Sequence, residues 1–104
     1  MINQKTTSNQ MTVTSKTNFQ PTRYNGWANY ETWNVSLWMQ NSKFLYNTAV
    51  ACVEYKNDDE TAYTKFIRCM HNGDNLTTND GVAWDDELVN HDEINEMMFD
   101  LHTN

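Results

Sequence analysis

The sequence predicts a mainly all-α protein: a compact bundle of three to five helices preceded by a disordered N-terminal tail. Apolar residues recur at helical spacing in several segments after residue 24, and no segment shows sustained period-two alternation. Residues 1–23 are instead rich in Thr, Asn, Gln and Ser and lack apolar periodicity. A chain of 104 residues is expected to form one domain, so we predict a flexible, slightly basic tail over 1–23 and an acidic helical domain over 24–104.

The first helix is predicted over Tyr30–Gln40. An Asn-Gly pair at 25–26 is a turn signal, and Asn29 is a suitable N-cap. Aromatic and apolar residues then follow the stripe of an amphipathic helix, at Tyr30, Trp33, Leu37 and Trp38. We therefore expect most of these side chains to face the core. Trp27 precedes the helix, and its role as a buried staple or as an exposed anchor stays open.

Two further helices follow. Ser42 is the expected cap of a helix over Lys43–Lys56, whose apolar residues form a broad face. The run NDDE then interrupts the pattern, and Asp58 or Asp59 is the expected cap of a third helix. Gly73 is expected to end that helix as a C′ glycine.

The last part of the chain is predicted to be a loop followed by a helix. Turn residues dominate the loop, with a short turn or helix around Trp84–Val89 and a hairpin near Val82–Trp84 as the alternative. Asn90 and Glu93 have the spacing of a capping box, in which the Glu93 side chain accepts from the Asn90 backbone. The apolar stripe of the last helix consists of Ile94, Met97, Met98 and Leu101.

Charge is distributed unevenly along the chain. Residues 1–23 hold three cationic side chains and no acid, a net charge of +3. Residues 24–104 hold four cationic side chains and fourteen acids, a net charge of −10. A body this acidic repels phosphate, so we expect no direct binding to nucleic acid.

The sequence contains none of the common catalytic or metal-binding motifs. Phosphate-binding glycine motifs, nucleophile elbows and paired histidines are absent, and a calcium-type loop around Gly81 lacks its first ligand. Cys52 and Cys69 have no metal-binding spacing, so we predict two free thiols in a reducing compartment, with a disulfide as the alternative. We therefore predict a non-enzymatic protein with no cofactor and no metal. The cluster Asp85–Glu87 is the enzyme alternative, and it would need a cleft around it.

The sequence also predicts a cytoplasmic protein that does not contact a membrane. Its first ten residues, MINQKTTSNQ, contain no apolar core of a secretory signal. No stretch approaches 18 consecutive apolar residues, which a membrane-spanning helix would need.

Acidic residues form a regular row on the last helix. Asp92, Glu96 and Asp100 recur every four residues, and no lysine lies between them to relieve a repulsion of about 0.2–0.5 kcal/mol per pair. Such a row repeats about every 6 Å, an interval comparable to that of phosphates along a DNA strand. Either the acids only keep the protein soluble, or they bind a basic partner. The candidate partner-binding residues are Asp85, Asp86, Glu87, Asp92, Glu93, Glu96 and Asp100.

Two segments also resemble a family. NYETWNVSLWMQN at 29–41 resembles a signature, NYETWNV-x-LW, of small proteins from bacteriophages, plasmids and some bacterial genomes. DGVAWDDEL and EINEMM, within 80–98, are similar to a segment that often follows it. The resemblance implies a phage-like setting and a small helical domain, and it transfers no catalytic residue because the family has no established activity.

These observations together predict a small protein that acts by stoichiometric protein binding. We expect an inhibitor of a host defence complex that binds nucleic acid, of the anti-CRISPR or anti-restriction type, in which the acidic surface mimics nucleic acid in a basic groove. Such a protein would work in the cytoplasm of the host cell. The alternative is a non-catalytic adaptor or regulatory module that binds its partner through an aromatic surface, with Trp27 and its neighbours as anchors.

Overall fold

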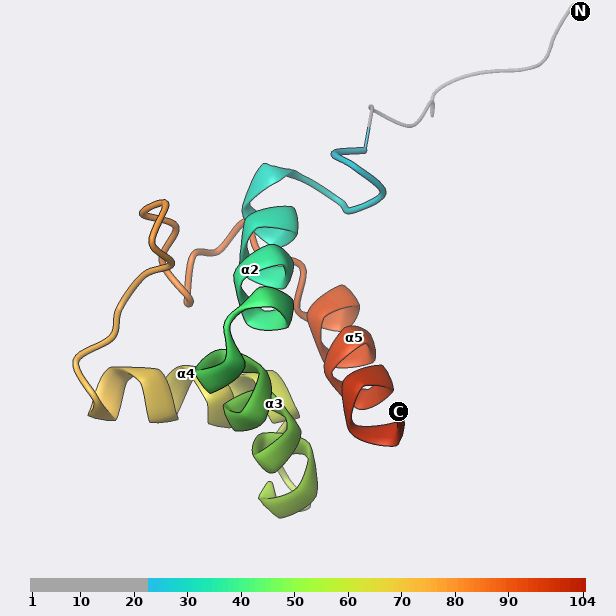
Figure 1. Ribbon diagram of the computed structural model, residues 1–104, viewed down its shortest axis with the longest axis vertical. Helices are drawn as coiled ribbons and strands as arrows, with labels where there is room; N and C mark the ends of the chain where they lie inside the picture. The colour runs from blue at the N-terminus through green and yellow to red at the C-terminus, as the bar shows by residue number, and fades with distance from the viewer. Residues whose placement is uncertain (1–22) are drawn as a thin grey trace, which may run out of the picture.

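The computed structural model describes residues 23–104, and this part of the chain contains four α-helices (Figure 1). The helices are α2 (Tyr30–Asn41), α3 (Lys43–Tyr55), α4 (Ala62–Asn72) and α5 (His91–Thr103). Within these residues the only β-type pairing consists of two isolated bridges. The predicted mainly all-α fold is therefore confirmed, whereas residues 1–22 of the tail predicted over 1–23 lie outside the described residues.

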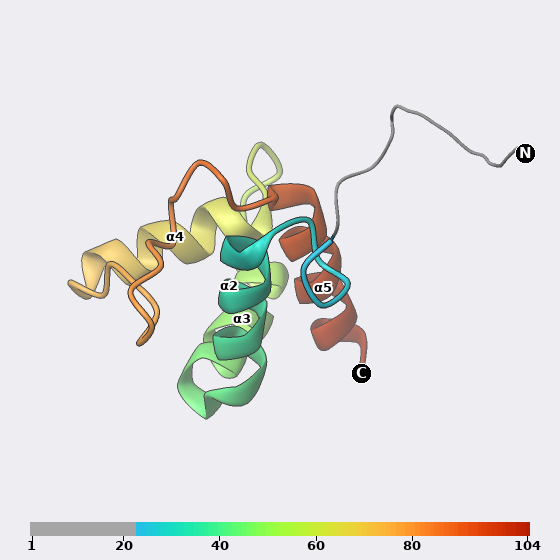
Figure 2. The ribbon, with the colours of Figure 1, turned by 90° about the horizontal axis from the view of Figure 1, so that it is seen from above.

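Helix α3 is the centre of the arrangement, since it packs against each of the other three helices. Helix α5 runs along one side of α2 and α3, and α4 crosses α3 (Figures 1 and 2). The connection over 73–90 leaves the far end of α4, passes the start of α2 and enters α5 (Figure 1). No helix among residues 23–104 has the length and hydropathy required to cross a bilayer.

The core draws on all four helices and on the long connection. Trp84, from the connection, is completely buried and makes an edge-on contact with Phe66 at a ring distance of 5.2 Å. Its carbonyl accepts a hydrogen bond from the buried Tyr63 hydroxyl, and its indole donates to Asn75 at 3.1 Å. The other core side chains with no exposed surface are Val35, Met39, Ala49, Ile94 and Met98.

The helix starts agree with the sequence except at α4. Asn29, Ser42 and Asn90 cap α2, α3 and α5 as predicted, each accepting a hydrogen bond from a backbone N–H three residues later. The predicted cap at Asp58 or Asp59 is wrong, because α4 begins later and Thr61 accepts from the Thr64 N–H at 3.1 Å.

The end of α4 differs from the prediction by one residue. Gly73 has a φ of −96° and is the C-cap, whereas Asp74 occupies the left-handed position with a φ of 60°. The Asn75 N–H donates to the Met70 carbonyl at 2.8 Å, and the Asp74 N–H donates to the His71 carbonyl at 3.0 Å. These two bonds form a Schellman motif, so Asp74 takes the place expected for the glycine.

The buried face of α2 also differs from the prediction. Tyr30 is 39% exposed, and Trp33, Leu37 and Trp38 are only half-buried. The apolar side chains Val35 and Met39 are buried, as expected of the core-facing side, but they are accompanied by Thr32, Asn34 and Ser36. These three are polar, and burying them is tolerable because each one is hydrogen-bonded.

The connection contains turns around Trp84–Val89, which agrees with the predicted short turn or helix. An isolated bridge joins Thr77 to Ala83, and the Thr78 N–H donates to the Val82 carbonyl at 2.8 Å. Gly81 sits in this loop with a φ of 91°, which glycine adopts without strain. The alternative of a hairpin near Val82–Trp84 is met only by this single bridge, and no strand forms within residues 23–104.

Candidate protein-binding site

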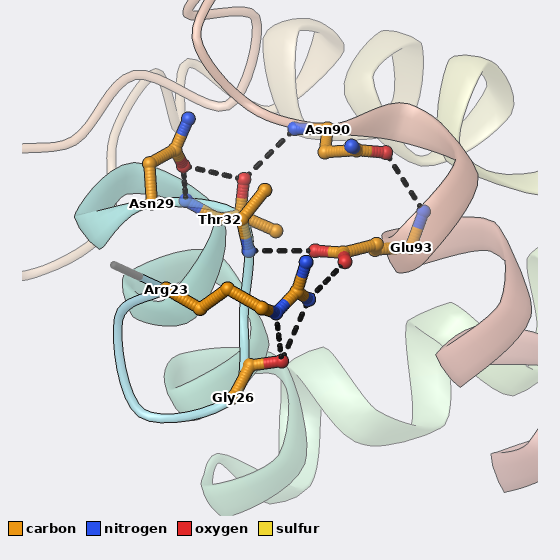
Figure 3. A network of polar contacts seen from close by, with 7 residues as sticks. Arg23, Gly26, Asn29, Thr32, Asn90 and Glu93 are labelled. Atoms are coloured by element: carbon orange, nitrogen blue, oxygen red, sulfur yellow. Dashed lines mark hydrogen bonds and ion pairs between the residues drawn. The ribbon is translucent and has the colours of Figure 1, made fainter. Parts of the chain in front are cut away.

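Polar residues at the start of α2 connect this helix to the start of α5 (Figure 3). Asn29 accepts hydrogen bonds from the Thr32 N–H at 2.8 Å and from the Thr32 hydroxyl at 2.6 Å. The Thr32 hydroxyl oxygen in turn accepts from the Asn90 N–H at 2.8 Å, and the Asn29 amide donates to the Leu88 carbonyl. These polar residues of the segment 29–41 therefore link the start of α2 to the backbone that leads into α5.

A second network fixes the loop before Trp84 to α2. The buried Asn34 amide donates to Asp80 at 2.8 Å and accepts from the Thr78 hydroxyl at 2.6 Å. The Trp38 indole donates to the same Asp80 oxygen at 2.8 Å. Hydrogen bonds from Asn34 and then from Trp38 lower the pKa of Asp80. The Asp80 carboxylate thus has a structural role.

Glu93, one of the predicted partner-binding residues, is committed to the fold in a similar way (Figure 3). Asn90 accepts from the Glu93 N–H at 3.1 Å as a capping box requires, but the Glu93 carboxylate does not return to the Asn90 backbone. It accepts from the Ala28 N–H at 2.9 Å and pairs with Arg23. Burial, the largest influence, raises the pKa of Glu93, but the bonds from Arg23 and Ala28 together lower it below its usual value.

Residues 23–27 form a tight turn against the helices. Asn25 and Gly26 have φ values of 49° and 89°, and Tyr24 and Trp27 exchange two backbone hydrogen bonds of 2.8 Å. Two consecutive positive φ values are typical of a type I′ turn, for which Asn-Gly is the preferred pair. Arg23, predicted to belong to the tail, donates to the Gly26 carbonyl at 2.7 Å and is part of the folded body.

A groove of about 450 Å³ separates this turn from α5. Its apolar lining comes from the half-buried Trp27 and from Met97 and Leu101, which are 7% and 8% exposed. Its carboxylates come from α5, at Glu93, Glu96 and Asp100. Arg23, Gly26, Gln40 and Asn104 complete the lining. We call this hollow the acid groove.

The structure divides the predicted partner-binding residues among three places. Glu93, Glu96 and Asp100 line the acid groove, whereas Asp92 lines a second hollow of about 330 Å³ beside Lys56 and Phe99. The remaining residues, Asp85, Asp86 and Glu87, lie in the connection after Trp84. The seven carboxylates therefore do not form one surface.

The loop acids and the helix acids also differ in their contacts. Asp85 lies 3.9 Å from the His71 ring, and Asp86 accepts from the Leu88 N–H at 2.8 Å. The row on α5 has no such partners: Asp92, Glu96 and Asp100 are all exposed, and none forms an ion pair with a cation within residues 23–104. These three carboxylates, which we call the α5 row, are available to another molecule.

An aromatic cluster that the sequence analysis missed lies on the outside of α2. Tyr24, Tyr30 and Trp33 contact one another with ring centroids 5.1–5.7 Å apart. Tyr24 is 41% and Tyr30 is 39% exposed, so the cluster faces solvent. Small polar residues lie between these aromatics in the sequence. They were the only available sign that the aromatic side of α2 does not pack against the core.

Two observations on residues 23–104 concern metal ligands and thiols. These residues contain no group of three or more His, Cys, Asp or Glu side chains that could hold a metal ion. Cys52 and Cys69 are free thiols, as predicted. Burial raises the pKa of the Cys52 thiol to about 12, which makes it a poor nucleophile at neutral pH.

Comparison with known proteins places the chain in a family without adding a role for any residue. A family model described as "Family of unknown function (DUF7249)" matches residues 20–104. No curated protein and no solved structure matches the chain. The function must therefore be argued from the structure itself.

Proposed function

We propose that this chain, which belongs to the DUF7249 family of unknown function, acts by stoichiometric protein binding. Its partner is the basic groove of a nucleic-acid-binding complex in a host defence system of the anti-CRISPR or anti-restriction type. The α5 row enters that groove in place of nucleic acid and blocks it. No catalytic step is needed for such an inhibitor.

The observation that carries this proposal is that the α5 row is exposed and has no cationic partner among residues 23–104. Other carboxylates have partners inside the fold: Glu60 pairs with Arg68, and Asp80 and Glu93 accept several hydrogen bonds. The row instead costs about 0.2–0.5 kcal/mol for each like-charged pair four residues apart. Asp100 lies near the C-terminal end of α5, where the helix dipole disfavours negative charge. Asp92 lies in the first turn of α5, where the dipole favours its charge, but Glu96 and Asp100 gain no such stabilisation from folding, whereas they do gain from binding to a cationic surface.

Size and charge are compatible with this function. Residues 23–104 hold five Lys and Arg side chains against fourteen carboxylates, a net charge of −9. Such a charge accelerates association with a basic partner and makes it sensitive to salt. A typical interface buries about 800 Å² on each partner, and the surface of this protein totals 5844 Å².

A second candidate function rests on the aromatic cluster. Tyr24, Tyr30 and Trp33 form an exposed patch of the residue types that dominate binding hot spots. An adaptor that binds through this patch would hold its partner with little dependence on salt. The two candidates depend on different side chains, so separate variants can distinguish them.

The test is a capture experiment from host lysate with three forms of the full chain as bait. They are the wild type, the reversal Asp92→Lys/Glu96→Lys/Asp100→Lys, and the control Asp58→Lys/Asp59→Lys. We expect the wild type and the control to retain a nucleic-acid-binding complex at low salt and to lose it at high salt. The α5 reversal should weaken binding about tenfold or more, because each lost attraction becomes a repulsion.

Two results would contradict the proposal. One is equal capture by the wild type and the α5 reversal. The other is capture that resists high salt but is lost in Tyr30→Ala/Trp33→Ala, which would favour the adaptor. Circular dichroism must first show that each variant keeps its helices.

A further inference from the structure

We infer that the acid groove binds an arginine side chain supplied by the partner protein. This inference rests on the proposed function and deepens it, because it names the group that the partner inserts. Arg23 lines the groove and already presents a guanidinium beside its carboxylates.

Arg23 shows how a guanidinium fits this lining (Figure 3). Its Nε and Nη2 atoms donate to the Gly26 carbonyl at 3.2 and 2.7 Å, and Nη2 also pairs with the Glu93 carboxylate. One wall of the groove therefore offers acceptors that match a planar, forked donor. Both oxygens of Glu93 are already engaged inside the fold, one by Arg23 and the other by the Ala28 N–H, so a second cation is better served by the carboxylates without partners.

The remaining carboxylates of the groove, Glu96 and Asp100, lie about one and two turns further along α5 than Glu93. They are exposed and have no cationic partner among the described residues. Their backbone positions are about 6 Å apart along the helix. A guanidinium has five N–H donors in a fixed fork and can bind both carboxylates, whereas a lysine ammonium is a point charge.

The apolar lining suits the rest of an arginine side chain. Trp27, Met97 and Leu101 can cover its methylene stem. The tryptophan ring also attracts a cation over its face. A groove with acidic groups alone would accept any cation, but the apolar residues beside these acids favour a long side chain with a charged end.

The arginine has to come from another kind of molecule. The chain has only two arginines, Arg23 and Arg68, and both already pair with carboxylates. Residues 1–22 contain lysines but no arginine. A second copy of the chain is disfavoured as well, because residues 23–104 carry a net charge of −9 and two such bodies repel each other.

The test is an NMR titration of the full chain with three blocked peptides, Gly-Arg-Gly-Arg-Gly and its lysine and citrulline analogues. The Trp27 indole N–H signal, assigned with Trp27→Phe, reports on the groove. We expect saturable shifts of this signal and of the Glu96 and Asp100 amides with the arginine peptide. Binding of the lysine peptide should be about fivefold weaker, and the neutral citrulline peptide should not bind.

Matched variants complete the design. Glu96→Gln/Asp100→Asn should weaken arginine binding about tenfold, because both charged acceptors are lost. The control Asp58→Asn/Asp59→Asn removes the same charge outside the groove and should change binding less than about twofold.

Equal binding of the arginine and lysine peptides, or unchanged arginine binding in Glu96→Gln/Asp100→Asn, would overturn the inference. Shifts of the Trp27 signal that depend only on protein concentration would also overturn it, since they would indicate a second copy in the groove. If arginine binding fails but the α5 reversal still abolishes partner capture, only this inference falls. If arginine binds but the α5 reversal leaves capture unchanged, the proposed function falls instead.

Discussion

The loop against α2 and the outer face of α5 are both acidic, but they use their carboxylates differently. Asp80 in the loop accepts hydrogen bonds from Asn34 and Trp38, whereas Glu96 and Asp100 on α5 have no partner within residues 23–104. Acidity alone therefore does not identify a binding surface. We expect changes in the loop to reduce stability and changes on α5 to reduce binding.

The largest effect is expected where the loop enters the core. Trp84→Ala removes a completely buried side chain that packs on Phe66, so it should lower the free energy of unfolding by about 3–5 kcal/mol. Urea unfolding followed by circular dichroism measures this loss. Trp84→Phe, which keeps an aromatic ring, should cost clearly less, and equal losses would indicate that packing is not the cause.

A smaller loss is expected from the buried amide of the loop network. Asn34→Leu removes the acceptor of the Thr78 hydroxyl and one donor to Asp80, so it should cost about 1–3 kcal/mol. The double variant Asn34→Leu/Thr78→Val should lose less free energy of unfolding than the two single variants lose in sum, because the two side chains share one hydrogen bond. Strictly additive losses would contradict the network.

Glu93 lies on α5 but is expected to behave like the loop residues. Glu93→Gln should destabilise the protein by about 1 kcal/mol, because the charged bond to Arg23 is lost at a partly exposed site. The pKa of Glu93 is lowered in the folded state, so its contribution is complete above its unfolded pKa of about 4.3 and disappears as the pH falls through the lower folded value. Glu93→Gln should therefore show a weaker acid-induced loss of stability than the wild type. Identical pH profiles would contradict the Arg23 pairing.

The smallest effect on stability is expected for the free acids of the groove. Glu96→Gln/Asp100→Asn should change the free energy of unfolding by less than about 0.5 kcal/mol, with a slight gain from reduced repulsion. Thermal unfolding at low salt detects this difference best. A loss above about 1 kcal/mol would mean that these acids support the fold after all.

Sequence reasoning succeeded where the physical cause is local. The caps Asn29, Ser42 and Asn90 were predictable, because each bonds to a backbone N–H three residues later. The turn at Asn25-Gly26 was predictable for the same reason, although its type I′ geometry was recognised only from the two positive φ values. Where several possible N-caps lie close together, the prediction chose the wrong one: Thr61, and not Asp58 or Asp59, caps α4.

Partners that are distant in sequence explain most of the errors. Thr32 and Asn34 could not be placed in the interior beforehand, since they bind Asn90 and Thr78, which are 58 and 44 residues away. Glu93 has the right spacing for a capping box, but Arg23, 70 residues away, captures its carboxylate. The α5 row was visible in the sequence, whereas the acid groove beside it depends on the turn at 23–27.

The most direct test of the central claim is a competition between this protein and nucleic acid for the complex that it captures. If the α5 row occupies the nucleic-acid groove, stoichiometric amounts of the wild type should release labelled nucleic acid at low salt. Asp92→Lys/Glu96→Lys/Asp100→Lys, folded to the same extent, should release none. Simultaneous binding of the wild type and nucleic acid to one complex would contradict the claim.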